Sequence, residues 1–276
     1  MLKSLHREHK ESKMLEGLYI ASSAGVKQQR KLDVISNNMA NLNTPGFKRD
    51  DLVFKELIPP FAAPQSMEAN RNTLLPSGLS NQGVSYVEVN GQVTDFHQGA
   101  LVSTGNPFDL AMEGDGFFVV ETPDGPRYAR TGSFKVDDQR RLVDKEGHVL
   151  QGVGETNLLM PIDSSVVSVD SQGSISILSN QQVQNIGQLK VVRFENPGTL
   201  KKEGNGLYSL SDPNEQALPH ENPGVLQGFV EHSNVNAVEE MTKMIQTLRT
   251  FEAYQRIIQS IDDADQQSIT SIARLA

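Results

Sequence analysis

The stretch SNNMANLNTPGFKRD, Ser36 to Asp50, decides where the first structural element of the chain ends. Four of its first eight residues are asparagine, a mediocre helix former whose amide group both donates and accepts hydrogen bonds. Pro45 disfavours helical geometry at Thr44, and Gly46 gives the backbone the freedom to turn away. We therefore expect a helix to end here and the chain to leave it through a turn formed by Thr44, Pro45, Gly46 and Phe47.

The asparagines of this motif have two interpretations. Asn37, Asn38 and Asn41 could cross-link packed helices through their amide groups. The alternative is that Asn43, together with Asn41, caps the end of the helix. The motif alone leaves both open.

Upstream of the motif, apolar or small residues recur at alternating spacings of three and four, which is typical of a heptad stripe. The stripe consists of Leu18, Ala21, Gly25, Gln28, Leu32, Ile35, Met39 and Leu42. It predicts a helix from about residue 15 to residue 42, about 40 Å long at 1.5 Å per residue. Residues 14–44 are assigned to this amino-terminal helix, and residues 1–13 to a charged, disordered extension.

The carboxy-terminal end repeats the pattern after the cap-like segment SNVNAVEE, and residues 231–276 are predicted to form a second long helix. Its apolar residues fall into two phases, the second shifted by one position. The first phase is Val238, Met241, Ile245 and Leu248, and the second includes Phe251, Tyr254, Ile258 and Ile261. The predicted subunit-contact residues are Leu18, Leu32, Ile35, Asn37, Asn38, Met39, Asn41, Leu42, Val238, Met241, Ile245, Leu248, Phe251, Ile258 and Ile261.

Between the helices the sequence changes to short alternating apolar runs separated by Gly, Pro, Asn and Asp. Asn90-Gly91 and Asp124-Gly125 each lie between two such runs, which predicts β-hairpins. We expect a mostly antiparallel β domain over residues 81–230. Residues 45–80 are rich in proline and predicted to be an extended connector. The fold class is thus α+β, with long terminal helices that pair as a coiled-coil-like core in an assembly.

An isolated amphipathic helix is marginally stable in water, so each terminal helix needs a partner. Residues 14–50 carry five Lys or Arg against three acidic residues, and residues 231–276 carry four against seven, so the two ends attract each other. Two paired helices still expose apolar surface, which favours packing against neighbouring copies of the chain. Packing of both helices on their own β domain is the equally supported alternative.

Composition excludes several classes of function. The chain has no cysteine, which excludes disulfides and thiolate chemistry. A net charge of −9 argues against nucleic-acid partners, and no apolar run approaches the length of a bilayer span. No secretory signal peptide is predicted at the amino terminus. The segments DKEGHV and DSQGSI are interpreted as turns rather than calcium loops. We expect no catalytic residue, no cofactor and no metal.

Three blocks of the sequence resemble the flagellar rod and hook proteins, the axial proteins of the bacterial flagellum. The blocks are SNNMANLNTPGFKR (36–49), GNPFDLAMEGDGFFVVETPDGPRYARTGSFKVDDQRRLVD (105–144) and EHSNVNAVEEMTKMIQTLRTFEAYQRIIQSIDD (231–263). Within the family, GDGFFVV and FEAYQRIIQSIDDADQQ look more like the proximal rod members, with the distal rod members and other hook-type axial proteins as the alternative. RTFE at residues 249–252 departs from the RAYE pattern of the distal members.

The resemblance implies a structural, non-enzymatic subunit of the basal-body rod, the drive shaft of motility. It further implies export through the flagellar type III apparatus without signal cleavage, and assembly with copies of itself and other rod proteins in the cell envelope. Such a subunit makes no direct membrane insertion. An alternative of another class is a secreted β domain that binds or hydrolyses carbohydrate.

Overall fold

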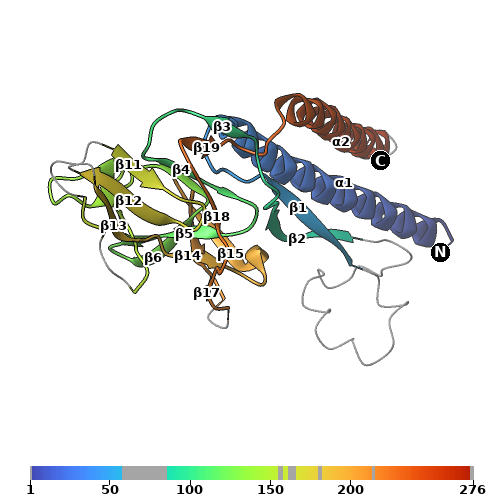
Figure 1. The fold of residues 1–276 in the computed structure, drawn as a ribbon. Helices are drawn as coiled ribbons and strands as arrows, with labels where there is room; N and C mark the ends of the chain where they lie inside the picture. Colours follow the sequence, from blue (N-terminus) through green and yellow to red (C-terminus); the bar gives the residue numbers. More distant parts are fainter. Residues whose placement is uncertain are drawn as a thin grey trace. The chain divides into compact units, whose positions relative to one another are not determined.

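The computed structural model describes residues 2–57, 86–154, 158–160, 166–179, 182–212 and 215–273. A long helix lies at each end of the chain, and antiparallel strands lie between them (Figure 1), so the α+β class is confirmed. The chain divides into two compact units. The first comprises residues 1–39, 50–93 and 238–276, and the second comprises residues 40–49 and 94–237.

The helices are α1 (Leu2–Ala40) and α2 (Ala237–Ala273), with a short 3-10 helix η3 (Pro197–Thr199). The strands are β1 (Asp50–Leu57), β2 (Tyr86–Thr94), β3 (Leu101–Ser103), β4 (Asp109–Glu113), β5 (Phe117–Thr122), β6 (Gly125–Ala129), β7 (Thr131–Ser133), β8 (Lys135–Val136), β9 (Leu142–Val143), β10 (Val149–Leu150), β11 (Val166–Val169), β12 (Ser174–Ser179), β13 (Gln182–Gln188), β14 (Val191–Arg193), β15 (Leu200–Gly204), β16 (Leu207–Leu210), β17 (Leu218–Pro219), β18 (Gly224–Gln227) and β19 (Phe229–Glu231).

Helix α1 starts earlier than the sequence predicted. It begins at Leu2, whereas we expected a disordered extension over residues 1–13. Residues 2–16 contain neither proline nor glycine and are rich in Leu, Lys, Glu and Arg, which all favour helix. The helix ends at Ala40, four residues before the Thr-Pro-Gly turn. Within the described residues, neither α1 nor α2 contains a stretch apolar enough to cross a membrane.

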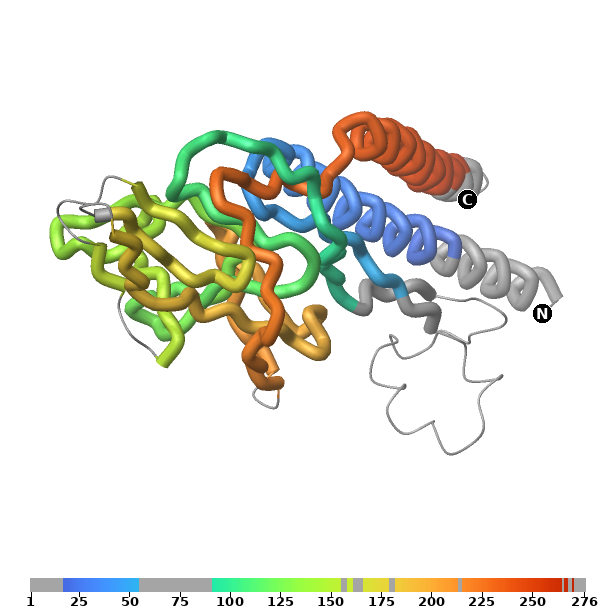
Figure 2. The backbone as a smooth tube through the Cα atoms, viewed as in Figure 1, coloured from blue at the N-terminus to red at the C-terminus, as the bar shows by residue number. Residues whose placement is uncertain are grey.

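Helices α1 and α2 run antiparallel within the first unit, as the tube in Figure 2 also shows. At one end, the Asn38 side chain reaches Glu240. At the other end, a methyl group on Gly17 would touch Ile261 Cδ1 at 3.7 Å. Asn38 lies 21 positions after Gly17, and Ile261 lies 21 positions after Glu240. The alignment of α1 against α2 is therefore the same at both contacts, which lie about 30 Å apart along the helix axes.

The first unit also contains the two-stranded sheet β1-β2, and here two predictions were wrong. Residues 50–57 form a strand where we expected connector, and Asn90-Gly91 lies inside one continuous strand rather than in a hairpin turn. Pairing with β1 extends β2 through these two residues, so sheet formation overrides their local turn preference. The predicted connector residues 58–80 lie outside the described residues.

The second unit is built from antiparallel sheets. Its largest sheet has the order β15-β16-β6-β5-β10-β9-β8, with β14 and β17 joined through β5. Sheets β11-β12-β13, β18-β4-β7 and β19-β3 complete it. The predicted hairpin around Asp124-Gly125 is confirmed: β5 pairs with β6, and Thr122 lies opposite Gly125.

Two apolar clusters form the core of the second unit. The larger packs Phe118, Leu150 and Ile175, which are fully buried, among other aliphatic side chains. The smaller is aromatic and is centred on Phe117, Tyr128 and Tyr208. Burying such side chains contributes about 1.5 to 3 kcal/mol each, so the unit has a substantial core of its own.

Candidate functional site

Asn38 is the asparagine that explains the amide-rich motif at the end of α1. Its side chain is buried, accepts a hydrogen bond from the Asp50 N–H at 3.0 Å and donates one to the Asp50 carbonyl at 2.9 Å. The same Nδ2 lies 3.3 Å from Glu240 Oε2, at the start of α2. One amide therefore joins the end of α1, the start of β1 and the first turn of α2.

Glu240 is almost fully buried and makes a second bond, to Lys243 Nζ at 3.0 Å. A buried carboxylate is costly unless it is hydrogen-bonded, so the contacts of Glu240 with Asn38 and Lys243 offset that cost. We refer to Asn38, Asp50 and Glu240 as the Asn38 clamp. The sequence indicated Asn38 as a possible helix cross-link but indicated neither of its partners.

The other asparagines of the motif lie elsewhere. The Asn41 side chain accepts a hydrogen bond from the Thr44 hydroxyl at 3.1 Å, and the Thr44 N–H donates to the Asn41 carbonyl at 3.1 Å. Asn37 and Asn43 are exposed. The motif thus combines one buried cross-link, made by Asn38, with a hydrogen-bonded turn after the helix, and capping of the helix by Asn43 stays a prediction.

The Thr-Pro-Gly turn is held from several sides within the second unit. Gly46 has a φ of +68°, and its N–H donates to the Glu231 carbonyl at 2.8 Å. Its carbonyl accepts from the Tyr208 hydroxyl at 3.1 Å. A Cβ at this position would lie 3.0 Å from Thr131 Cγ2, so glycine is needed for conformation and for space. Phe47 is buried just after the turn.

A buried ion network lies directly beside this turn. Lys48 Nζ is 2.6 Å from Glu231 Oε1, and both side chains are fully buried. Arg130 Nε lies 3.3 Å from Glu231 Oε2, and its Nη1 donates to the Gly116 carbonyl at 2.7 Å. Burial lowers the pKa of Lys48, and the Glu231 carboxylate opposes that shift. The sequence did not indicate this network, because no local pattern pairs Lys48 with a residue 183 positions later.

The next residue, Arg49, links the same two segments of the chain. Its N–H donates to Asn234 Oδ1 at 2.7 Å, and Asn234 Nδ2 donates to the Asp95 carbonyl at 2.8 Å. Partial burial alone would raise the pKa of Asp95, but hydrogen bonds from His97 and the charge of Arg49 hold it below its usual value. Residues 46–49 and 231–234 are therefore joined directly in the second unit.

The predicted subunit-contact residues of the two helices differ in exposure. On α1, Ile35 is buried, and Leu18, Leu32 and Met39 are partly buried, as is Leu42 in the turn after the helix. On α2, Phe251, Ile258 and Ile261 are partly buried. The first phase of α2 is exposed: Val238 74%, Met241 51%, Ile245 53% and Leu248 42%. We call these four residues the α2 stripe.

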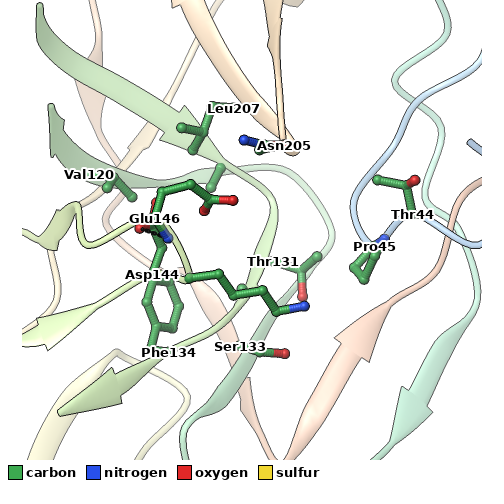
Figure 3. A pocket seen from close by; sticks show the side chains of 13 residues that line it. Thr44, Pro45, Val120, Thr131, Ser133, Phe134, Asp144, Glu146, Asn205 and Leu207 are labelled. Carbon is green, nitrogen blue, oxygen red and sulfur yellow. Dashed lines mark hydrogen bonds between the residues drawn. The ribbon is translucent and has the colours of Figure 1, made fainter.

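A cavity of about 170 Å³ borders the Thr-Pro-Gly turn in the second unit. Figure 3 shows Thr44 and Pro45 on one side of it and Val120, Phe134 and Leu207 on the other. Its lining residues are Thr44, Pro45, Val120, Ala129, Thr131, Gly132, Ser133, Phe134, Asp144, Lys145, Glu146, Asn205 and Leu207. The lining combines apolar side chains, hydroxyl groups and both signs of charge, so it favours no single class of ligand.

The one group among the described residues with the spacing of a metal site is Asp144, Glu146 and His148, whose ligand atoms lie within 4.8 Å of one another. Asp144 Oδ1 already accepts from the N–H groups of Glu146 and His148, and its Oδ2 lies 2.8 Å from His148 Nδ1. These bonds are those of a tight turn, as the sequence predicted for DKEGHV.

Three family models match the chain in the order of the three blocks. "Flagella basal body rod protein" matches residues 18–48, "Flagellar hook protein FlgE/F/G D1 domain" matches residues 111–177, and "Flagellar basal body rod FlgEFG protein C-terminal" matches residues 226–271. The first match contains Asn38 and Lys48, and the third contains Glu231 and the α2 stripe.

Curated relatives extend over nearly the whole chain. "Flagellar basal-body rod protein FlgG" of Bacillus subtilis is 36% identical over 93% of this chain and 98% of its own length. The protein of the same name from Borreliella burgdorferi is 34% identical over 91% and 96%. "Flagellar basal-body rod protein FlgF" of Caulobacter vibrioides is 30% identical over 95% and 98%. The chain therefore belongs to the flagellar basal-body rod protein family, whose members are structural subunits of the rod rather than enzymes.

Proposed function

We propose that this rod subunit polymerises through its terminal helices and that neighbouring subunits cover the α2 stripe. The observation that carries the proposal is the exposure of four large apolar side chains on one face of α2. Complete burial of such a side chain contributes about 1.5 to 3 kcal/mol, so covering the exposed parts of all four contributes roughly 4 kcal/mol per copy. Contiguous apolar surface of this kind marks a protein contact.

The partly buried residues of both helices form the other half of the same arrangement. In this proposal, a coiled-coil-like pair of helices forms the core of the assembly. It contains the second phase of α2 and the α1 residues Leu18, Leu32, Ile35 and Met39, and Leu42 joins it just after α1. The Asn38 clamp fixes the register of this pair, because a slipped helix would leave the buried Glu240 without its amide partner. The α2 stripe then remains available to the next copy.

The domain plan follows from these roles. We place residues 14–44 and 231–276 in the helical core and residues 94–230 in the outer β domain. Strands β1 and β2, which the sequence assigned to the connector and to the β domain, belong to the unit that contains the helices. Asn37 and Asn41, which lie on or just after the last turn of α1, join the apolar residues as contacts between copies.

Family membership supports the basal body as the location and other rod proteins as the partners, and the export route is part of the proposal. The subunit works in the basal body with other rod proteins, after export through the flagellar type III apparatus without a cleaved signal peptide. Relatives named FlgG and FlgF are both similar to this chain. The residues in its sequence motifs favour the proximal rod over the distal rod. Immunolabelling of purified basal bodies decides between the two positions.

The experiment places two charges on the α2 stripe. In the Met241→Glu/Ile245→Glu variant, circular dichroism of the monomer stays unchanged because both side chains are already exposed. Incorporation into rods and swimming are lost, because two carboxylates would have to be buried in the contact. The matched control, Thr242→Glu/Gln246→Glu, adds the same charge at the same spacing on exposed polar positions. Normal rods in the first variant would refute the proposal.

A further inference from the structure

The three-stranded sheet β11-β12-β13 carries an exposed apolar row. Val166 pairs with Leu178, and Leu178 pairs with Val183, so the three side chains lie side by side on one face. They are 55%, 41% and 76% exposed, whereas Ile175 and Ile177 on the opposite face are buried in the core. Beyond the row, Ser168, Ser176 and Asn185 continue the outward face with uncharged polar groups.

The two edges of this sheet differ. At the β11 edge, the Gln227 side chain accepts from the Val169 N–H at 3.0 Å and donates to the Val167 carbonyl at 2.9 Å, so it caps the strand. Strand β13 is the other edge. A bulge between Ile175 and Ser176 distorts pairing only at the far end of β13, away from Val183. Residues 182–185 are all exposed along this edge.

Charge is almost absent from this surface. Residues 166–188 contain a single charged side chain, Asp170, in a protein whose charged residues make up 21% of the sequence. Soluble proteins usually protect an exposed edge strand with charged residues, proline or a covering segment. An edge strand with an apolar row and no such charges is typical of a surface that pairs with another chain.

We propose that β13, together with the row Val166, Leu178 and Val183, binds a second copy of this chain. The net charge of −9 makes two copies repel each other, and the repulsion is smallest where both contacting surfaces are neutral. A partner of opposite charge would be recognised by charged residues, which this surface lacks. The inference rests on the proposed function in one respect, because rod assembly supplies the neighbouring copies.

The test uses the full chain with a photo-crosslinking amino acid at position 183, co-produced with a differently tagged copy in cells that build rods. The expected product has about twice the mass of the 30.3 kDa chain and carries both tags. The same probe at position 124, an exposed site in the β5-β6 turn, gives roughly tenfold less of this product. A product with a different protein, or none from position 183, overturns the inference.

A probe at position 245, in the α2 stripe, separates this inference from the proposed function. Self-crosslinking from position 245 without any from position 183 overturns the β13 contact and leaves the helix contact standing. A second variant, Asn185→Glu, puts a charge on the neutral edge without touching the core. It should lower the crosslink yield from position 183 severalfold, whereas the matched Gln139→Glu variant should not; equal yields overturn the inference.

Discussion

Removing the charge of Lys48 should destabilise the second unit far more than removing the charge of a surface lysine. In Lys48→Met, Glu231 loses an ammonium group that lies 2.6 Å away with both side chains fully buried. Breaking a buried ion pair costs about 3 to 5 kcal/mol. Glu231 keeps Arg130 and the Gly99 N–H at 2.9 Å, so we expect the lower end, about 3 kcal/mol. For a unit of this size, that lowers the Tm by roughly 6 to 12 °C.

The assay is urea unfolding of the full chain, followed by near-ultraviolet circular dichroism of the aromatic cluster around Phe117 and Tyr208. Lys201→Met, which removes an exposed lysine, should change the free energy of unfolding by less than about 0.5 kcal/mol. Adding Glu231→Gln to Lys48→Met should cost less than the two single changes summed, with a coupling energy of about 0.5 to 3 kcal/mol. A loss below about 1 kcal/mol in Lys48→Met, or strict additivity, would refute the reasoning, because the pair would then behave like an exposed one.

Asn38→Ala should destabilise the first unit by about 1 to 3 kcal/mol, because it removes both bonds to the Asp50 backbone and one to Glu240. Chemical unfolding monitored by helical circular dichroism measures this loss; the exposed Asn37→Ala should have little effect, and equal effects would argue against the clamp. Gly46→Ala should cost about 1 to 3 kcal/mol, since φ is +68° and Thr131 leaves little room; an unchanged melting curve would contradict this. Below about pH 4, unfolding of the second unit should become easier. In the folded state, hydrogen bonds from His97 and Arg141 hold the pKa values of Asp95 and Asp137 below their usual value. The unfolded state therefore takes up protons on these two carboxylates at a higher pH than the folded state does. Asp137→Asn should reduce this acid dependence in a pH series of unfolding curves, and an unaltered series would count against the assignment.

Local patterns in the sequence were enough to predict the α+β class and the two terminal helices. The heptad spacing from Leu18 to Leu42 and the Thr-Pro-Gly motif placed the end of α1 within two residues of Ala40. The signal around Asp124-Gly125 identified the β5-β6 hairpin. Asn90-Gly91 misled the prediction, because pairing with β1 is a long-range interaction that the local sequence does not contain.

The candidate site was only partly predictable, because its contacts also join residues that lie far apart in the sequence. The character of Asn38 suggested a cross-link, but its partners, Asp50 and Glu240, depend on how α1, β1 and α2 fold together. The sequence indicates the buried pair of Lys48 and Glu231 even less, because a lysine and a glutamate on turn-rich segments usually lie at the surface. Because the chain belongs to the rod family, the alternative function, that of a secreted protein that binds or hydrolyses carbohydrate, is dropped.

Accessibility of the α2 stripe in the monomer and in the rod tests the central claim most directly. Because the chain has no cysteine, Ile245→Cys introduces a single thiol, which can be labelled with a maleimide in dilute monomer and in purified basal bodies. We predict fast labelling of the monomer, strong protection in the rod, and full labelling again once the rods are dissolved in denaturant. Equally fast labelling of the monomer and the intact rod would contradict the claim that neighbouring subunits cover this helix.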